Sequence, residues 1–430
     1  MNRRNWFKAM GGLALASALP TYLRAQGATA ETAKVVIRDF EQPMFNIPAQ
    51  VSTPAIIESV ELLKNGKNYF VRTRSTDGAV GLTGTKQIND FIPIFKNLVA
   101  PYFIGKDARE IESLVDGVYR ANYKLAGIPF WSPVAYIEQS LLDMLGKMAN
   151  KPVGEMLGGV WRDEIPVYLS GSPRDLRAED EVEVYVRGIA ETGTKAVKFK
   201  IGGRMSRNLD VYPGRTETLI KTARERLGDE VDLAVDANGS YDVAEGIRIG
   251  RLLEKYNFSF FEEPCPWENR TETQAVAKAL NIPVSGGEQD SSLWQFQWLM
   301  DNKVVSIIQP DINYNGGLIR AKRVAKMAEE LGINIVPHNT QTGANSVNIL
   351  QFASCTKNAL PRMEYPWRKP QETPEWYAPD FKITDGRIKV PKAAGMGIEF
   401  NPDFINKAEV LVRVDTPVSS GNVSGSGTSN

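Results

Sequence analysis

Three acidic residues stand at equal intervals in the middle of the chain, and their spacing predicts a metal site. Asp236, Glu262 and Glu288 are each 26 residues apart, and each follows an apolar run of strand type. If these runs form neighbouring parallel strands, the three carboxylates meet, and their repulsion and desolvation are costly. A divalent cation removes that cost, and Mg²⁺ prefers such hard oxygen ligands. We therefore expect these residues to bind Mg²⁺.

Two further groups at strand ends could move protons. Lys198 and Lys200 are two residues apart, so both side chains point to the same side of a strand. Two ammonium groups close together near a metal depress each other's pKa, which favours Lys200 as a base. His338 is the only histidine, and Asp311 lies 27 residues before it. A lone histidine is often a satisfied core residue, but a carboxylate bonded to its ring would make it a second base opposite Lys200.

The elements that must position these residues follow a regular pattern. Runs of strand type recur at intervals of 23 to 36 residues with helical patterns between them, which favours a closed parallel (β/α) barrel. A doubly wound sheet is the alternative, but no glycine-rich phosphate loop follows the first run. The runs begin near Ile165, Ala196, Asp232, Phe258, Ile282, Val305, Asn334 and Arg362.

The two chain ends have different characters. Residues 1–30 combine a basic start containing Arg3–Arg4 with a short, weakly apolar stretch, which resembles a twin-arginine export signal and predicts a periplasmic protein. Residues 34–160 are expected to form a capping domain, with strand alternation first and then a helix around 137–146. The barrel is expected at 161–375. A return to the capping domain at 376–415 includes a hairpin turn at Asp385–Gly386, and 416–430 is expected to be a disordered tail.

Composition excludes several classes of protein. Lys+Arg and Asp+Glu both number 51, so no bulk charge favours nucleic acid or an anionic membrane surface. Cys265 and Cys355 make neither a disulfide framework nor a metal motif. No run after the N-terminal segment reaches 18 apolar residues, so we expect no membrane span in the mature protein.

These motifs together resemble the mandelate racemase group of the enolase superfamily, in the mandelate racemase/muconate lactonizing enzyme family. The resemblance implies a modified (β/α)₇β TIM barrel with an α+β capping domain built from both chain ends, and a trio of carboxylates that ligates Mg²⁺. It implies that Lys200 is one base, tuned by Lys198, and that His338, held by Asp311, serves the other substrate face. The motifs are Lys198–Phe199–Lys200, Asp236–Ala237–Asn238, Glu262–Glu263–Pro264, Gly287–Glu288, Asp311 and His338.

Two more residues take roles from the same resemblance. Glu364 is similar to a family acid that hydrogen-bonds the enolate oxygen. Asn238, beside the first metal ligand, would contact the substrate. Some sugar-acid dehydratases of the family carry histidine at that position, and the asparagine here argues against those members.

The predicted reaction is Mg²⁺-dependent removal of the α-proton of a carboxylate through an enediolate, with dehydration of an acid sugar as the first expectation. Racemisation, epimerisation or cycloisomerisation of a hydroxy acid, and a non-catalytic periplasmic sugar-acid binder, stay open as alternatives. Specificity is expected from residues 42–48 and 79–86, from Arg174 and from Arg368. A homo-oligomer is expected as well.

Overall fold

The computed structural model describes residues 40, 42–86, 88–171, 173–367, 371 and 374–415. The predicted export signal and the predicted C-terminal tail lie outside these residues. Among the helices that are described, none has both the length and the apolar character needed to cross a membrane.

The capping domain is built on a four-stranded antiparallel sheet with strand order β15-β1-β2-β3. Strands β1 (Ile57–Asn65), β2 (Asn68–Ser75) and β3 (Val80–Gly84) lie early in the chain, whereas β15 (Glu409–Asp415) ends the described part. The buried carboxylate of Glu61 on β1 binds Arg72 of β2 at 2.5 Å and Arg413 of β15 at 3.0 Å. The cap therefore uses both chain ends, as predicted.

Helices complete the cap. The long α5 (Ile128–Ala149) packs across β2 and β3. It comes so close that a Cβ at Gly81 would lie 1.8 Å from the carbonyl oxygen of Ser140. The remaining elements are α1 (Ile47–Gln50), η1 (Ile88–Phe91), α2 (Ile92–Ile94), η2 (Phe95–Val99), α3 (Ala100–Phe103), η3 (Ala108–Glu110), α4 (Ile111–Ala121) and α6 (Val153–Met156).

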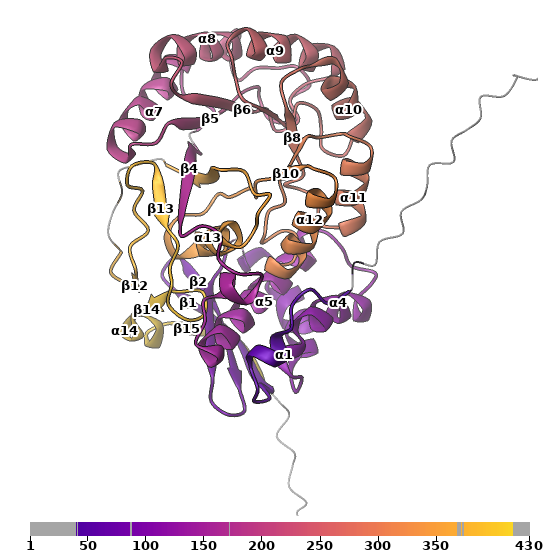
Figure 1. Ribbon diagram of the computed structural model, residues 1–430, viewed down its shortest axis with the longest axis vertical. Coiled ribbons are helices and arrows are strands. Elements are labelled where there is room, and N and C mark those ends of the chain that lie inside the picture. Colours follow the sequence, from indigo (N-terminus) through magenta and orange to yellow (C-terminus); the bar gives the residue numbers. More distant parts are fainter. Residues whose placement is uncertain are drawn as a thin grey trace, which may run out of the picture. The chain divides into compact units, whose positions relative to one another are not determined.

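Eight parallel strands form the second part, and helices α7 to α12 follow them in an arc (Figure 1). The sheet order is β10-β9-β8-β7-β6-β5-β4-β11, and hydrogen bonds from the Ile335 and Leu360 amides join β10 to the segment that leads into β11. This is the predicted (β/α)₇β barrel. Its strands are β4 (Glu164–Ser170), β5 (Ala196–Lys200), β6 (Asp232–Asp236), β7 (Phe261–Glu262), β8 (Val284–Gly286), β9 (Ile307–Ile308), β10 (Asn334–Ile335) and β11 (Met363–Pro366).

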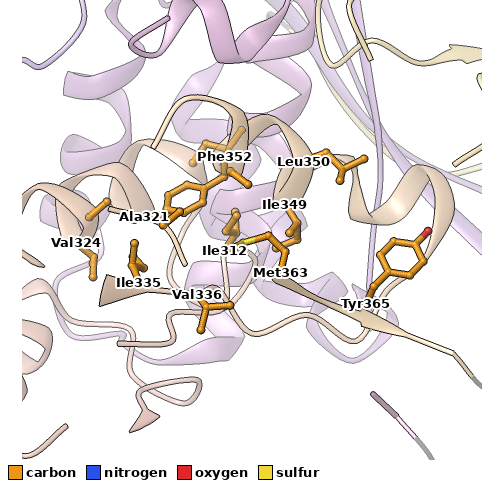
Figure 2. Packing of buried hydrophobic residues seen from close by; sticks show 14 of the residues in the cluster. Ile312, Ala321, Val324, Ile335, Val336, Ile349, Leu350, Phe352, Met363 and Tyr365 are labelled. Atoms are coloured by element: carbon orange, nitrogen blue, oxygen red, sulfur yellow. The ribbon is translucent and has the colours of Figure 1, made fainter. Parts of the chain in front are cut away.

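The barrel helices cover the outside of these strands. Figure 2 shows the packing near the end of the barrel, where Ala321 and Val324 of α12 and Phe352 of α13 lie over Ile335 and its neighbour Val336. The helices are α7 (Ala178–Thr192), α8 (Arg215–Leu227), α9 (Val243–Lys255), α10 (Arg270–Ala279), α11 (Leu293–Asp301), α12 (Leu318–Glu330), η4 (Gly343–Ser346) and α13 (Val347–Ser354).

Buried polar contacts join cap and barrel. Arg323 of α12 makes two hydrogen bonds to Asp116 of α4, at 2.6 and 3.0 Å. Glu138 of α5 accepts a hydrogen bond from the Ile319 amide at the start of α12, at 2.7 Å, and burial raises the pKa of this carboxyl to about 8. Gly317 has φ 110°, and a Cβ there would lie 2.5 Å from the Glu138 carboxyl carbon. These contacts fix the cap over the barrel.

The chain returns to the cap after the barrel. Asp385 and Gly386, with φ of 49° and 71°, make the expected turn, but the following strand β13 (Arg387–Lys389) pairs antiparallel with β4 of the barrel. Strands β12 (Tyr377–Ala378) and β14 (Glu399–Phe400) and helix α14 (Pro402–Asn406) precede β15.

Candidate active site

The structure brings the three predicted metal ligands together. Asp236 ends β6, Glu262 ends β7, and Glu288 follows β8 by two residues, and all three are buried. Each offers an oxygen, and these oxygens lie within 4.8 Å of one another. Among the described residues, no group donates a hydrogen bond to one buried oxygen of Glu262 and one of Glu288. Three buried carboxylates, two of which have an unused oxygen, are a donor set that suits a hard divalent cation.

Both strand lysines point into the site, as their alternation on β5 predicts. Lys198 is fully buried, and its Nζ lies 2.6 Å from Glu262 and 2.9 Å from Glu364. Lys200 forms an ion pair with Asp236 and keeps 14% of its side chain exposed. Burial alone would lower the pKa of Lys198, but Glu262 and Glu364 hold it well above its ordinary value. The prediction that the two lysines lower each other's pKa is therefore wrong for Lys198, because the carboxylates around it raise its pKa more than burial and the second ammonium group lower it.

The aspartate and histidine also meet as predicted. Asp311 follows β9 and His338 follows β10, and His338 Nδ1 lies 2.8 Å from Asp311 Oδ2. The other ring nitrogen, Nε2, faces Glu288 at 3.3 Å. Burial would lower the pKa of His338, but Glu288 and Asp311 raise it to about 8. Asp311 therefore orients the ring so that Nε2 points toward the carboxylate trio.

The remaining predicted residues lie beside this centre. Glu364 on β11 accepts a hydrogen bond from the Asn339 amide at 3.0 Å, and burial, which would raise its pKa, is outweighed by Lys198 and His338, which lower it. Asn238 has φ 41°, and its amide donates to Asp236 at 2.8 Å. Its side-chain oxygen accepts from Arg174 at 3.0 Å.

One cavity of about 700 Å³ opens onto these groups. Lys200 and His338 both line it, together with Glu288, Glu364 and Asn238. Lys200 from β5 and His338, which follows β10, thus face the same space beside the trio. This arrangement can hold a carboxylate substrate and act on its α-carbon from two sides.

Several residues of the site were not predicted. Gln309 is fully buried and donates to Glu262 at 2.8 Å. It lies two residues before Asp311, so the alternation of β9 could have revealed it. The cavity lining also includes Arg204, Trp267 and Tyr314, for which the sequence carries no comparable signal.

The predicted specificity segments have different outcomes. Lys86 and Arg174 line the cavity. No residue of the 42–48 segment is among the lining residues, and the Met44 and Phe45 amides bind Glu112 of α4. A role of this segment in specificity stays a prediction. Arg368 lies outside the described residues.

Comparison with known proteins identifies the class. Residues 45–158 match the N-terminal domain of the mandelate racemase/muconate lactonizing enzymes, and residues 181–404 match the enolase C-terminal domain-like family. The chain therefore belongs to the mandelate racemase/muconate lactonizing enzyme family of the enolase superfamily. It is an enzyme, a lyase or a racemase.

Individual relatives are consistent with that class. The chain is 29% identical to arabinonate dehydratase of Saccharolobus solfataricus over 70% of this chain and 79% of that protein. It is 25% identical to D-xylonate dehydratase of Haloferax volcanii, covering 87% and 94%. A mandelate racemase/muconate lactonizing protein from Paracoccus denitrificans Pd1222, solved in complex with magnesium, superimposes with a TM-score of 0.76 at 27% identity, covering 83% and 99%.

Proposed function

We propose that the protein is a Mg²⁺-dependent dehydratase of an acid sugar. The observation that carries this proposal is the position of Lys200 and His338, which line one cavity beside three buried carboxylates. The two dehydratase relatives support dehydration over the other reactions of the family.

Asp236, Glu262 and Glu288 would hold Mg²⁺. When bound, Mg²⁺ polarises the substrate carboxylate and offsets the negative charge that develops on its oxygens as the α-proton leaves. Glu364 lies next to Lys198 at the same centre and would contact a carboxylate oxygen of the substrate.

The chain's own groups would move the protons. Lys200 takes the α-proton, and the electron pair of that C–H bond passes into the substrate carboxylate, which becomes an enediolate. The pair then returns to form a double bond between the α- and β-carbons as the C–O bond at the β-carbon breaks. His338 gives a proton to the departing hydroxyl, which leaves as water. The enol that remains tautomerises to a 2-keto acid. Asp311 keeps the ring oriented throughout, because it binds Nδ1.

Racemisation is the second candidate, and the same pair of opposed bases favours it. A base on each face permits removal of the α-proton from one side and its return from the other. The two reactions differ in product: dehydration removes water, whereas racemisation returns an isomer of equal mass.

Incubation of a panel of acid sugars in D₂O with Mg²⁺ tests the proposal. We expect α-deuterium in recovered substrate, or a 2-keto-3-deoxy product, by NMR and mass spectrometry, and both should disappear with EDTA. A folded, Mg²⁺-loaded protein that returns every acid unchanged after long incubation would refute the proposal and favour a sugar-acid binder.

We also propose that the protein is exported by the twin-arginine route and acts in the periplasm as a homo-oligomer. The Arg3–Arg4 pair supports export. Cell fractionation of the full chain and of its R3K/R4K variant tests this, because the variant should stay in the cytoplasm. Light scattering of the purified enzyme measures the oligomeric state.

A further inference from the structure

A lysine from the cap reaches the proton-transfer side of the cavity. Lys86 follows β3 by two residues and lines the cavity together with His338 and Tyr314. Its Nζ lies 3.6 Å from Asp311 Oδ2, the oxygen that also contacts His338, and 4.3 Å from the ring centre of Tyr314. The proposed proton transfers do not use this cation.

The main chain of Lys86 is held by a buried side chain. The Lys86 amide donates to the hydroxyl of Tyr136 at 3.0 Å, and that hydroxyl donates to the Lys86 carbonyl. Tyr136 lies on α5 and is 1% exposed. Both main-chain groups of the lysine are therefore fixed by one rigid helix, which makes this a built position and not a flexible loop tip.

The ammonium group has more N–H donors than partners. Its side chain is 9% exposed, Asp311 Oδ2 lies 3.6 Å from Nζ, and the Tyr314 side chain is its other polar neighbour, so at least one of its three N–H groups has no acceptor among the described residues. Burial lowers the pKa of Lys86, but Asp311 and Tyr314 raise it more, so the group keeps its charge. A buried cation with unused donors costs free energy unless a ligand accepts from it.

We propose that Lys86 binds the β-hydroxyl oxygen of the substrate, the oxygen that leaves in the dehydration. This inference rests on the proposed function and deepens it, because it assigns a recognised β-hydroxyl to the substrate. Lys86 keeps its proton throughout. Its N–H donates to the hydroxyl oxygen and orients it toward His338, which alone supplies the proton that turns the hydroxyl into water.

A comparison of two substrates and two enzymes tests the role. We measure α-proton exchange into D₂O, with Mg²⁺, for a substrate acid sugar and for its analogue that lacks only the β-hydroxyl. K86M should lower kcat/KM for exchange of the hydroxylated acid roughly tenfold to a hundredfold, the usual range for a hydrogen bond to a charged donor. Exchange of the deoxy analogue should change by less than about threefold, because that analogue has no oxygen for Lys86 to bind.

The controls separate binding from indirect effects. K67M removes a lysine from the exposed turn between β1 and β2 and should leave both rates unchanged. If K86M does not fold, K86Q serves instead, since it removes the charge and keeps a polar side chain. Y136F removes both main-chain hydrogen bonds of Lys86 and should reproduce part of the selective loss.

The outcomes are distinct. Equal loss for both substrates would overturn the inference, because Lys86 would then act only through Asp311. An unchanged K86M would also overturn it, as would a loss that follows removal of a terminal hydroxyl instead of the β-hydroxyl. Absence of exchange by the wild-type enzyme with every acid would refute the proposed function itself.

Discussion

Replacement of Glu288 by glutamine should leave the metal-free enzyme at least as stable as wild type but should weaken its binding of Mg²⁺. Asp236 and Glu262 each have a lysine ammonium as a partner, whereas no ion pair of Glu288 with a lysine is found among the described residues. One Glu288 oxygen accepts a hydrogen bond from the Gln289 side chain at 3.0 Å, and the other lies 3.3 Å from His338 Nε2. Two like charges 4.8 Å apart repel by about 3.5 kcal/mol at an effective dielectric constant near 20. E288Q removes two such repulsions and one attraction to His338, so we expect the metal-free variant to be at least as stable as wild type.

Mg²⁺ should stabilise the E288Q variant less than it stabilises the wild-type protein. At a Mg²⁺ concentration 100 times the dissociation constant, binding stabilises the wild-type fold by about 2.7 kcal/mol. If the lost carboxylate weakens binding a hundredfold, the gain at the same concentration falls to about 0.4 kcal/mol. For a chain of this length these values correspond to shifts in Tm of about 3 °C and below about 1 °C.

Scanning calorimetry with and without Mg²⁺ measures the shifts, and isothermal titration gives the two dissociation constants. E268Q is the matched control, because Glu268 is exposed in the segment after β7 and lies outside the trio. An E288Q protein that keeps the full Mg²⁺-induced shift would show that this carboxylate is not a ligand. An equal loss in E268Q would mean that the shift reports bulk charge.

Three further changes test other parts of the molecule. K200M removes the proposed base and should slow α-proton exchange by roughly 10² to 10⁴, measured by NMR in D₂O. D116N leaves Arg323 buried without its carboxylate and should reduce the free energy of unfolding by about 3–5 kcal/mol, measured with urea. E138Q should flatten the stability profile between about pH 4.5 and pH 8: the pKa of Glu138 is about 8 in the fold, so the wild-type protein loses stability across that range, by up to roughly 5 kcal/mol, measured by Tm.

Each of these has an outcome that contradicts it. Undiminished exchange by a folded K200M would assign the base elsewhere. An unchanged urea midpoint for D116N would mean that Arg323 finds another partner or water. If the Tm of wild type and E138Q stay parallel between pH 5 and pH 8, Glu138 is already ionised at pH 5, stabilised by the amides at the start of α12.

The barrel could be predicted from the sequence because most of its strands carry two signals at once. Six of the eight apolar runs end in or lead directly to an ionisable residue, and the eight predicted starts fall within three residues of the observed strands; β10 begins at Asn334 and β7 at Phe261. Helix α5 was predicted only in its second half. Pro129 and Pro133 suggest a break, but Pro129 lies in the first turn and Pro133 loses one hydrogen bond, while residues 130–146 are all buried. Tertiary burial outweighs that local cost.

The cap's contribution to the site could not be predicted in the same way. Asp311 and His338 are separated by one βα unit, so regular spacing reveals the pair. Lys86 lies more than 200 residues before them, after a short edge strand, and no periodicity connects it with the barrel. Only the packing of α5, through Tyr136, brings it to the cavity. Residues placed by a repeated unit are therefore predictable one by one, whereas for the cap the sequence predicted only that the 79–86 segment contributes, and not that Lys86 lies beside Asp311.

The register of the parallel sheet explains why the candidate base and the metal ligands lie so close together. Lys200 pairs with Asp236 across β5 and β6, and Asp236 pairs with Glu262 across β6 and β7. Neighbouring parallel strands lie about 4.8 Å apart, close enough for one oxygen from each member of the trio to lie within 4.8 Å of the others. A shift of one residue in β6 would turn Asp236 to the opposite face and replace it with an apolar neighbour, Val235 or Ala237. The relative positions of Lys200, Asp236 and Glu262 therefore depend on strand register. We expect insertions and deletions to be tolerated in the connecting helices but not in the strands.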